Sequence, residues 1–136
     1  MNLQNRRDLI DSLLRYFPEI STPLVNLATY LNGAIEKDEA RNEETIDNIL
    51  RELKHLVTTL NQLFEYVQSE TLSTGLEHEE FTLYKSFLFN LTSGIKLMLA
   101  WMQDKDEPEK KLKESVDMLF TAGQQILELV NRITKD

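Results

Sequence analysis

The chain has 136 residues and a mass of 15.9 kDa, enough for one hydrophobic core but not for two. Its 15 basic and 23 acidic residues give a net charge of −8, which argues against binding of nucleic acid or anionic lipid. The lack of cysteine excludes a disulfide scaffold, a thiolate metal site and a cysteine nucleophile. No apolar stretch follows the first residues, so we expect no signal peptide and a cytoplasmic protein.

The first predicted helix covers about residues 3–38. Apolar residues recur every three or four positions from Ile10 to Ile35, the spacing of one helical face. This stripe passes through Pro18 and Pro23 without losing register, although a proline usually ends a helix. We therefore predict one helix kinked at the two prolines. The alternative is two short helices joined by a loop at 18–22.

Three more helices are predicted from the same spacing. The second follows the charged segment 36–44 and carries a stripe from Ile46 to Val67, ending near Glu70. The third covers roughly 78–103. The fourth begins at Pro108, a favoured first residue of a helix.

The four helices predict an all-α protein, an antiparallel four-helix bundle made of two helical hairpins. The bundle forms a single domain, 1–136, with one hairpin at about 3–70 and the other at about 78–134. Gly123 falls on the apolar stripe of the fourth helix. We expect it to let a neighbouring helix approach closely.

The sequence contains no recognisable catalytic or metal-binding pattern. Glu52 and His55 have the Glu-x-x-His spacing of di-iron bundles, but such sites need two of these motifs facing inward. His55 lies on the polar face of its helix, and we expect both it and His78 to be solvated. Nucleophile elbows and phosphate-binding glycine loops are absent. We therefore predict no enzyme activity, no cofactor and no metal.

One short segment resembles a known signalling motif. Residues 18–24 read Pro-Glu-Ile-Ser-Thr-Pro-Leu and resemble the phosphoacceptor motif His-Glu-(Ile/Leu)-Arg-Thr-Pro-Leu of the histidine-kinase dimerisation and phosphotransfer domain. Five of the seven positions agree; Pro18 replaces the histidine and Ser21 the arginine. The family's domain is a helical hairpin whose first helix kinks at the motif's proline. Residues 49–67 resemble the second helix of that hairpin in pattern.

The second half of the chain is similar to the same family in a more degenerate form. Residues 87–99 resemble the family's longer motif, with Ser93 at the position of the histidine. A tandem of two such hairpins implies a pseudo-dimer within one chain, and hence a monomer. Because neither repeat keeps the histidine, and because the nucleotide-binding domain of the kinases is missing, the resemblance implies neither kinase nor phosphotransfer activity.

The resemblance implies a docking function instead. The helix face around the family's histidine binds the receiver domain of a response regulator, so we expect a non-catalytic regulator that binds a receiver domain or a histidine kinase. The expected contact residues lie on the outward side of the third helix and at the matching positions of the first: Phe89, Ser93, Lys96 and Ala100, with Pro18, Ser21 and Val25. Phe89 is expected to be the main contact, with packing at the bundle edge or under the 71–80 connection as the alternative.

Two other functions remain open from the sequence. The first is an acidic inhibitor, such as an immunity protein or antitoxin, that neutralises a basic partner through the acidic clusters 36–47 and 77–80. The second is phosphotransfer through His55. The family of phosphotransfer bundles has Lys and Gly after its histidine, where this chain has Thr58 and Thr59.

Overall fold

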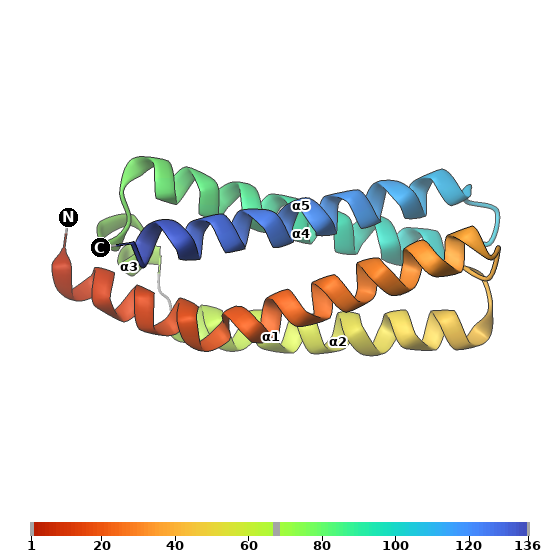
Figure 1. Ribbon diagram of the computed structural model, residues 1–136, viewed down its shortest axis with the longest axis horizontal. Coiled ribbons are helices and arrows are strands. Elements are labelled where there is room, and N and C mark those ends of the chain that lie inside the picture. The colour runs from red at the N-terminus through yellow and green to blue at the C-terminus, as the bar shows by residue number, and fades with distance from the viewer. Residues whose placement is uncertain (1, 67–68, 136) are drawn as a thin grey trace.

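The computed structural model describes residues 2–66 and 69–135, and all regular secondary structure in these ranges is helical. The helices are α1 (Leu3–Glu36), α2 (Glu43–Tyr66), α3 (Ser69–Gly75), α4 (His78–Gln103) and α5 (Glu109–Ile133). Figure 1 shows the long helices α1, α2, α4 and α5 lying along the long axis of the molecule. The short α3 lies at the end where both termini are found. The all-helical prediction is confirmed.

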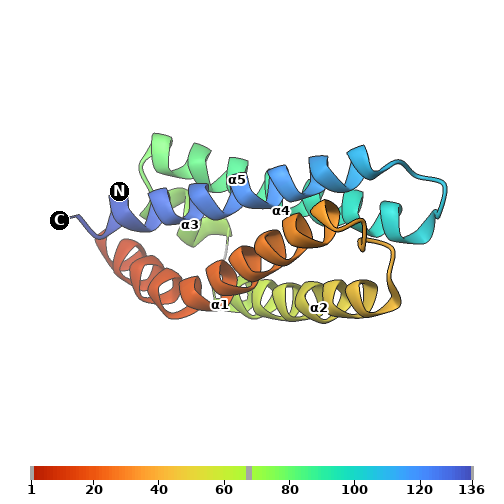
Figure 2. The ribbon, with the colours of Figure 1, turned by 45° about the vertical axis from the view of Figure 1, so that its right-hand side comes forward.

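Helix α1 is continuous and contains both Pro18 and Pro23. The alternative of two short helices with a loop at 18–22 is therefore wrong. Each proline lacks the N–H that an interior helical residue donates four positions back. The apolar stripe explains why the helix continues, since Leu13, Ile20 and Leu24 on one side are all buried. Figure 2 shows α1 changing direction along its length.

The predicted connection between the second and third helices contains a helix of its own. The prediction ended the second helix near Glu70, whereas α2 ends at Tyr66 and α3 covers Ser69–Gly75. The predicted stripe residue Val67 lies outside the described residues. Contacts with distant residues hold the end of α3, because the Asn2 N–H donates to the Thr74 carbonyl at 2.8 Å. A seven-residue helix held in this way leaves no periodicity for a sequence analysis to detect.

The core lies between the four long helices, and their packing is uneven. Backbone contact is most extensive between α4 and α5, and α1 contacts α5, α2 and α3. The backbones of α2 and α4 hardly approach each other. The largest fully buried side chains, Trp101, Tyr84 and Phe87, all come from α4. Large side chains on α4 therefore fill space that close backbone packing fills elsewhere.

Gly94, rather than Gly123, allows two helices to approach closely. A Cβ placed on Gly94 would lie 2.9 Å from Leu119 Cδ2 and 3.2 Å from the Ser115 carbonyl oxygen. The nearest neighbour of a Cβ on Gly123 would be Leu24 Cδ1, at 3.9 Å. The prediction for Gly123 is therefore wrong, because a Cβ there would make only an ordinary van der Waals contact with the Leu24 side chain of α1. The missing side chain of Gly94 brings α4 and α5 together.

We expect Gly94→Ala to lower the free energy of unfolding by about 1–3 kcal/mol, because the methyl group overpacks the α4–α5 contact. Gly33→Ala is the matched control, since a Cβ on Gly33 meets nothing within 4 Å. Alanine favours the helix there by up to about 1 kcal/mol. Urea unfolding followed by circular dichroism measures both changes. A stabilising Gly94→Ala would contradict the close approach.

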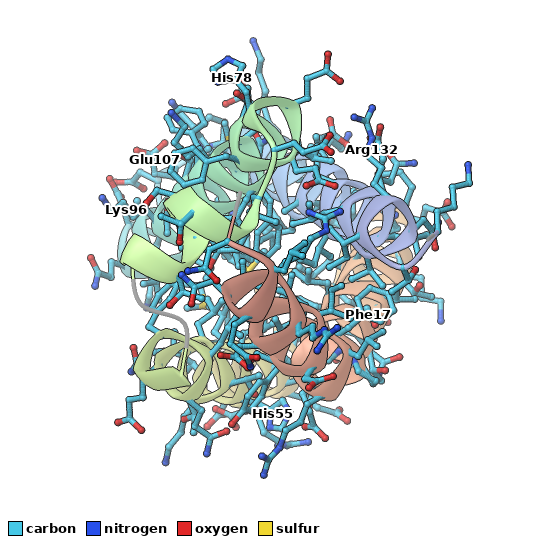
Figure 3. All side chains as sticks on the ribbon, turned by 90° about the vertical axis from the view of Figure 1, so that its left-hand side faces the viewer. Phe17, His55, His78, Lys96, Glu107 and Arg132 are labelled. Atoms are coloured by element: carbon cyan, nitrogen blue, oxygen red, sulfur yellow. The ribbon has the colours of Figure 1, made fainter. Side chains whose placement is uncertain are left out.

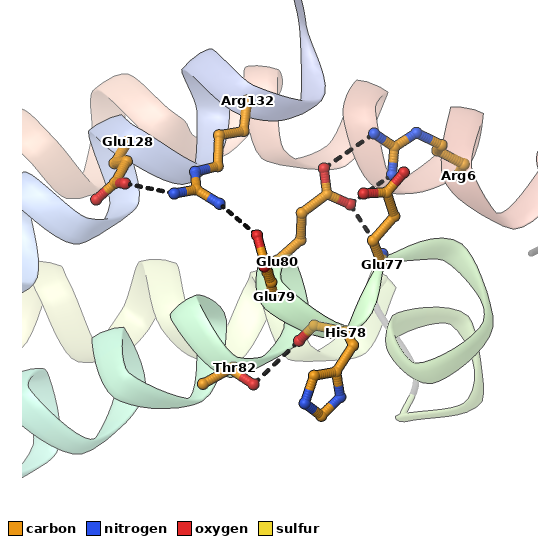
Figure 4. Close-up of polar contacts among 8 residues, drawn as sticks. All are labelled: Arg6, Glu77, His78, Glu79, Glu80, Thr82, Glu128 and Arg132. Atoms are coloured by element: carbon orange, nitrogen blue, oxygen red, sulfur yellow. Dashed lines mark hydrogen bonds and ion pairs between the residues drawn. The ribbon is translucent and has the colours of Figure 1, made fainter.

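A buried ion pair ties α1 to α4 at the end that holds the termini. Arg6 Nη1 donates to Glu80 Oε1 at 2.7 Å, and Arg6 Nη2 donates to Glu80 Oε2 at 3.0 Å. Arg6 also donates to the Gly75 carbonyl at 3.2 Å. Glu80 accepts the Glu77 N–H at 2.9 Å, which caps the start of α4. Figure 4 shows Glu80 between these two partners.

Arg41 links the two turns at the opposite end of the molecule. Its guanidinium lies 3.8 Å from the centre of the Trp101 ring. It donates to the carbonyls of Trp101, Asp104 and Glu107 at 2.6, 2.8 and 3.1 Å. These carbonyls lie at the C-terminus of α4 and in the turn that follows, where helix carbonyls lack partners. The α1–α2 turn therefore caps α4.

Candidate functional site

An apolar groove lies between α1 and α5. It encloses a cavity of about 220 Å³ whose lining residues are Phe17, Ser21, Leu24, Val25, Leu119, Phe120, Gly123, Gln124 and Leu127. We call this set the apolar groove. Val25 is 60% exposed and Phe120 is 56% exposed, so large apolar side chains reach the surface on both walls. Such a concentration of exposed apolar surface is typical of a contact site for another molecule.

The apolar groove carries no charged side chain. None of its lining residues is ionisable, in a chain of which 28% of residues are charged. The sequence explains this locally, because α1 has no charged residue from Ile20 to Ile35 and α5 has none from Met118 to Leu127. A partner therefore meets an apolar surface with only the Ser21 hydroxyl and the Gln124 amide as polar groups.

Pro18, Ser21 and Val25 share one side of the continuous helix α1, but they line different depressions of the surface. Ser21 and Val25 line the apolar groove. Pro18 instead lines a polar cleft between α1 and α2, together with Arg51 and His55. His55 Nε2 lies 3.3 Å from Glu19 Oε2, and both side chains are more than half exposed. The prediction that His55 faces solvent is confirmed.

Phe89 is exposed, as predicted. It is 64% exposed on α4, so the alternative that it packs at the bundle edge or under the 71–80 connection is wrong. Lys96 and Ala100 are also exposed, and Ser93 is partly buried. These four residues share the outward side of α4, but none of them lines the apolar groove.

The two predicted sets of contact residues lie on different sides of the molecule. Figure 3 looks along the helices and shows Phe17, which lines the apolar groove, on the right and Lys96 on the left. One compact partner domain therefore cannot cover both sets. Phe120, Gly123 and Leu127 of α5 were not among the predicted contact residues. The sequence does carry a signal for them, the run without charged residues from Met118 to Leu127 in α5.

The acidic cluster 77–80 is largely occupied by internal contacts. Glu80 is buried against Arg6, and this hydrogen-bonded guanidinium holds the pKa of the Glu80 carboxyl below its ordinary value. Glu79 pairs with Arg132 at 3.5 Å, as Figure 4 shows. His78 accepts through its backbone carbonyl from the Thr82 hydroxyl at 3.0 Å. Glu80 therefore links α4 to α1, and Glu79 links α4 to α5.

No group of three or more His, Asp or Glu residues in the described ranges is placed to hold a metal ion. Burial raises the pKa of Tyr84 to about 12, so its phenol stays protonated in the core. None of the helices described here combines the length and the apolar character needed to cross a bilayer.

No family model, curated protein or solved structure matches the chain. The apolar groove is thus the candidate site that the structure itself defines.

Proposed function

We propose that the chain is a non-catalytic interaction module that binds another protein through the apolar groove. In this proposal α1, α2, α4 and α5 form an antiparallel four-helix bundle, kinked at Pro18 and Pro23. The two hairpins make a monomeric pseudo-dimer. The observation that carries the proposal is the uncharged groove between α1 and α5, which offers a partner a desolvated apolar contact.

The proposed partner is a receiver domain or a histidine kinase in the cytoplasm. This class follows from the resemblance of residues 18–24 to the phosphoacceptor motif of the histidine-kinase hairpin. Ser21 belongs to that segment and Val25 follows it directly. Both residues line the apolar groove. A chain that keeps the docking helix but lacks the histidine would bind the partner without phosphate exchange, and so sequester it.

Affinity capture from lysate of the native cells tests the proposal. We expect the wild-type chain to retain a receiver-domain protein or a histidine kinase, and Val25→Asp to lose at least about ten-fold in affinity, since it buries a carboxylate in the contact. Phe89→Arg is the matched control, because Phe89 is equally exposed but lies outside the groove. A partner lost with Phe89→Arg and kept with Val25→Asp would contradict docking at the groove.

The second candidate function is an acidic inhibitor of a basic protein. The net charge of −8 favours it, but Glu79 and Glu80 of the 77–80 cluster are engaged within the chain. The cluster 36–47 is then the surface available to a basic partner, and Glu43 and Glu44 are exposed there. We expect charge reversal at these two residues to abolish capture of such a partner, whereas Val25→Asp would leave it unchanged.

A further inference from the structure

A second surface, which we call the open seam, runs between α2 and α4. The side of α2 that faces α1 is marked by Asn48, which donates to the Tyr30 hydroxyl at 2.9 Å, and by His55, which pairs with Glu19. At about 100° per residue, Leu50, Val57 and Phe64 lie on the opposite side of α2. These three side chains are between 42 and 46% exposed. Spaced seven residues apart, they form an apolar stripe along the helix.

The facing side of α4 continues this surface. Gly94 and Asn90 mark the side of α4 that contacts α5, since a Cβ on Gly94 would touch Leu119 and Asn90 donates to Gln125 at 2.9 Å. The opposite side carries Leu99, which is exposed, together with the partly buried Leu88 and Ile95. Figure 3 places α2 and α4 on the same side of the molecule, away from the apolar groove.

Lysines border the open seam on both helices. Lys54 follows the stripe on α2 by helical position. On α4, Lys96 lies three residues before Leu99, and Lys85 lies three residues before Leu88. None of the three has a carboxylate within 4.0 Å in the part of the chain that the structure describes. Lys85 instead lies 4.9 Å from the centre of the Phe81 ring. Two acidic residues of α2 lie near this border by helical position: Glu43, seven residues before Leu50, and Asp47, seven residues before Lys54.

We propose that the open seam binds an amphipathic helix of a partner protein that carries acidic residues on both sides of its apolar stripe. The apolar side chains of Leu50, Val57 and Phe64 would pack against the partner's stripe. The ammonium groups of Lys54 on one border, and of Lys85 and Lys96 on the other, would pair with its carboxylates. This site is separate from the apolar groove and does not depend on the function proposed for the groove.

The charge of the chain makes the expected selectivity unusual. A chain of net charge −8 attracts basic peptides and repels acidic ones over most of its surface. A preference for an acidic helix therefore requires a local cationic border such as that of the open seam. Tighter binding of an acidic helix would therefore indicate the proposed site, whereas tighter binding of a basic helix would indicate unspecific electrostatic attraction.

Two synthetic peptides test the proposal by fluorescence anisotropy with the full-length chain. Both are 21-residue helices with the same leucine stripe; one has glutamate on both flanks of the stripe and the other has lysine. We expect the glutamate peptide to bind more tightly, and Lys54→Glu, Lys85→Glu and Lys96→Glu each to weaken it about two- to five-fold. Equal binding of both peptides, tighter binding of the lysine peptide, or no binding would overturn the proposal.

A matched pair of variants locates the bound peptide. Val57→Asp should abolish binding of the glutamate peptide, and Val25→Asp in the apolar groove should leave it unchanged. The three lysine variants keep the test decisive if Val57→Asp disturbs folding, which circular dichroism would reveal. Sedimentation of the peptide-free chain tests whether a second copy of the chain occupies the open seam instead. A dimer that dissociates in the Val57→Asp variant would show this and would overturn the proposal.

Discussion

Arg41→Ala is expected to cause a large loss of stability, about 2–4 kcal/mol. The guanidinium caps the C-terminus of α4 through the carbonyls of Trp101, Asp104 and Glu107 and covers the Trp101 ring. Its removal leaves these carbonyls without their donor and exposes the face of the indole. Because Trp101 is the single tryptophan and is 1% exposed, urea unfolding followed by its fluorescence reports directly on this end of the molecule.

Arg51→Ala is the matched control for Arg41→Ala. Arg51 is exposed on α2, and replacement of such a surface residue changes stability by less than about 0.5 kcal/mol. Arg41→Lys should recover only part of the loss, since an ammonium group cannot reproduce the planar fork of the guanidinium. Equal stability of the Arg41→Ala and Arg51→Ala variants would show that the turns are not joined as described.

Glu80→Gln is the second substitution expected to have a large effect, about 3–5 kcal/mol. It leaves the buried Arg6 guanidinium without its carboxylate and weakens the acceptor of the Glu77 N–H. The double variant Arg6→Met/Glu80→Leu should lose less stability than Arg6→Met and Glu80→Leu lose in sum when each is made alone, because the double variant removes both charges together. Additive losses, measured by urea unfolding, would contradict a coupled buried pair.

The same ion pair predicts how stability depends on pH. Since the pKa of Glu80 is lowered in the folded chain from its ordinary value of 4.5, the unfolded chain takes up the proton first as pH falls. The contribution of the ionised Glu80 to the free energy of unfolding is complete above about pH 5. It is lost progressively as the pH falls through the folded-state pKa. Between about pH 5 and about pH 3, the free energy of unfolding should therefore fall more steeply with decreasing pH for the wild-type chain than for Glu80→Gln. Parallel curves would contradict this assignment.

The long helices could be predicted from the sequence because their apolar stripes are regular. The third predicted helix, 78–103, matches α4, and the first continued through Pro18 and Pro23 as its stripe indicated. Burial of one side of each helix is a local property that spacing alone reveals. The helix α3 could not be predicted in this way, because it is held by contacts with the distant residues at the start of α1.

The candidate site could be predicted only in part. Exposure of Phe89 and Val25 follows from their position on one helix, and the structure confirms it. The apolar groove depends on how two helices lie beside each other, so the contribution of Phe120 could not be read from α5 alone. Gly123 was misinterpreted for the same reason, since only the three-dimensional packing shows that Gly94 faces the closer neighbour.

Mapping of amide chemical shifts tests most directly whether a signalling partner docks in the apolar groove. The labelled chain would be titrated with purified receiver domains and histidine kinases from the same cells. The proposed function predicts that a binding partner shifts the amide signals around Ser21, Val25 and Gly123, while those around Val57 stay in place. A partner that shifts the signals of the acidic segment 36–47 and leaves the groove unchanged would contradict it.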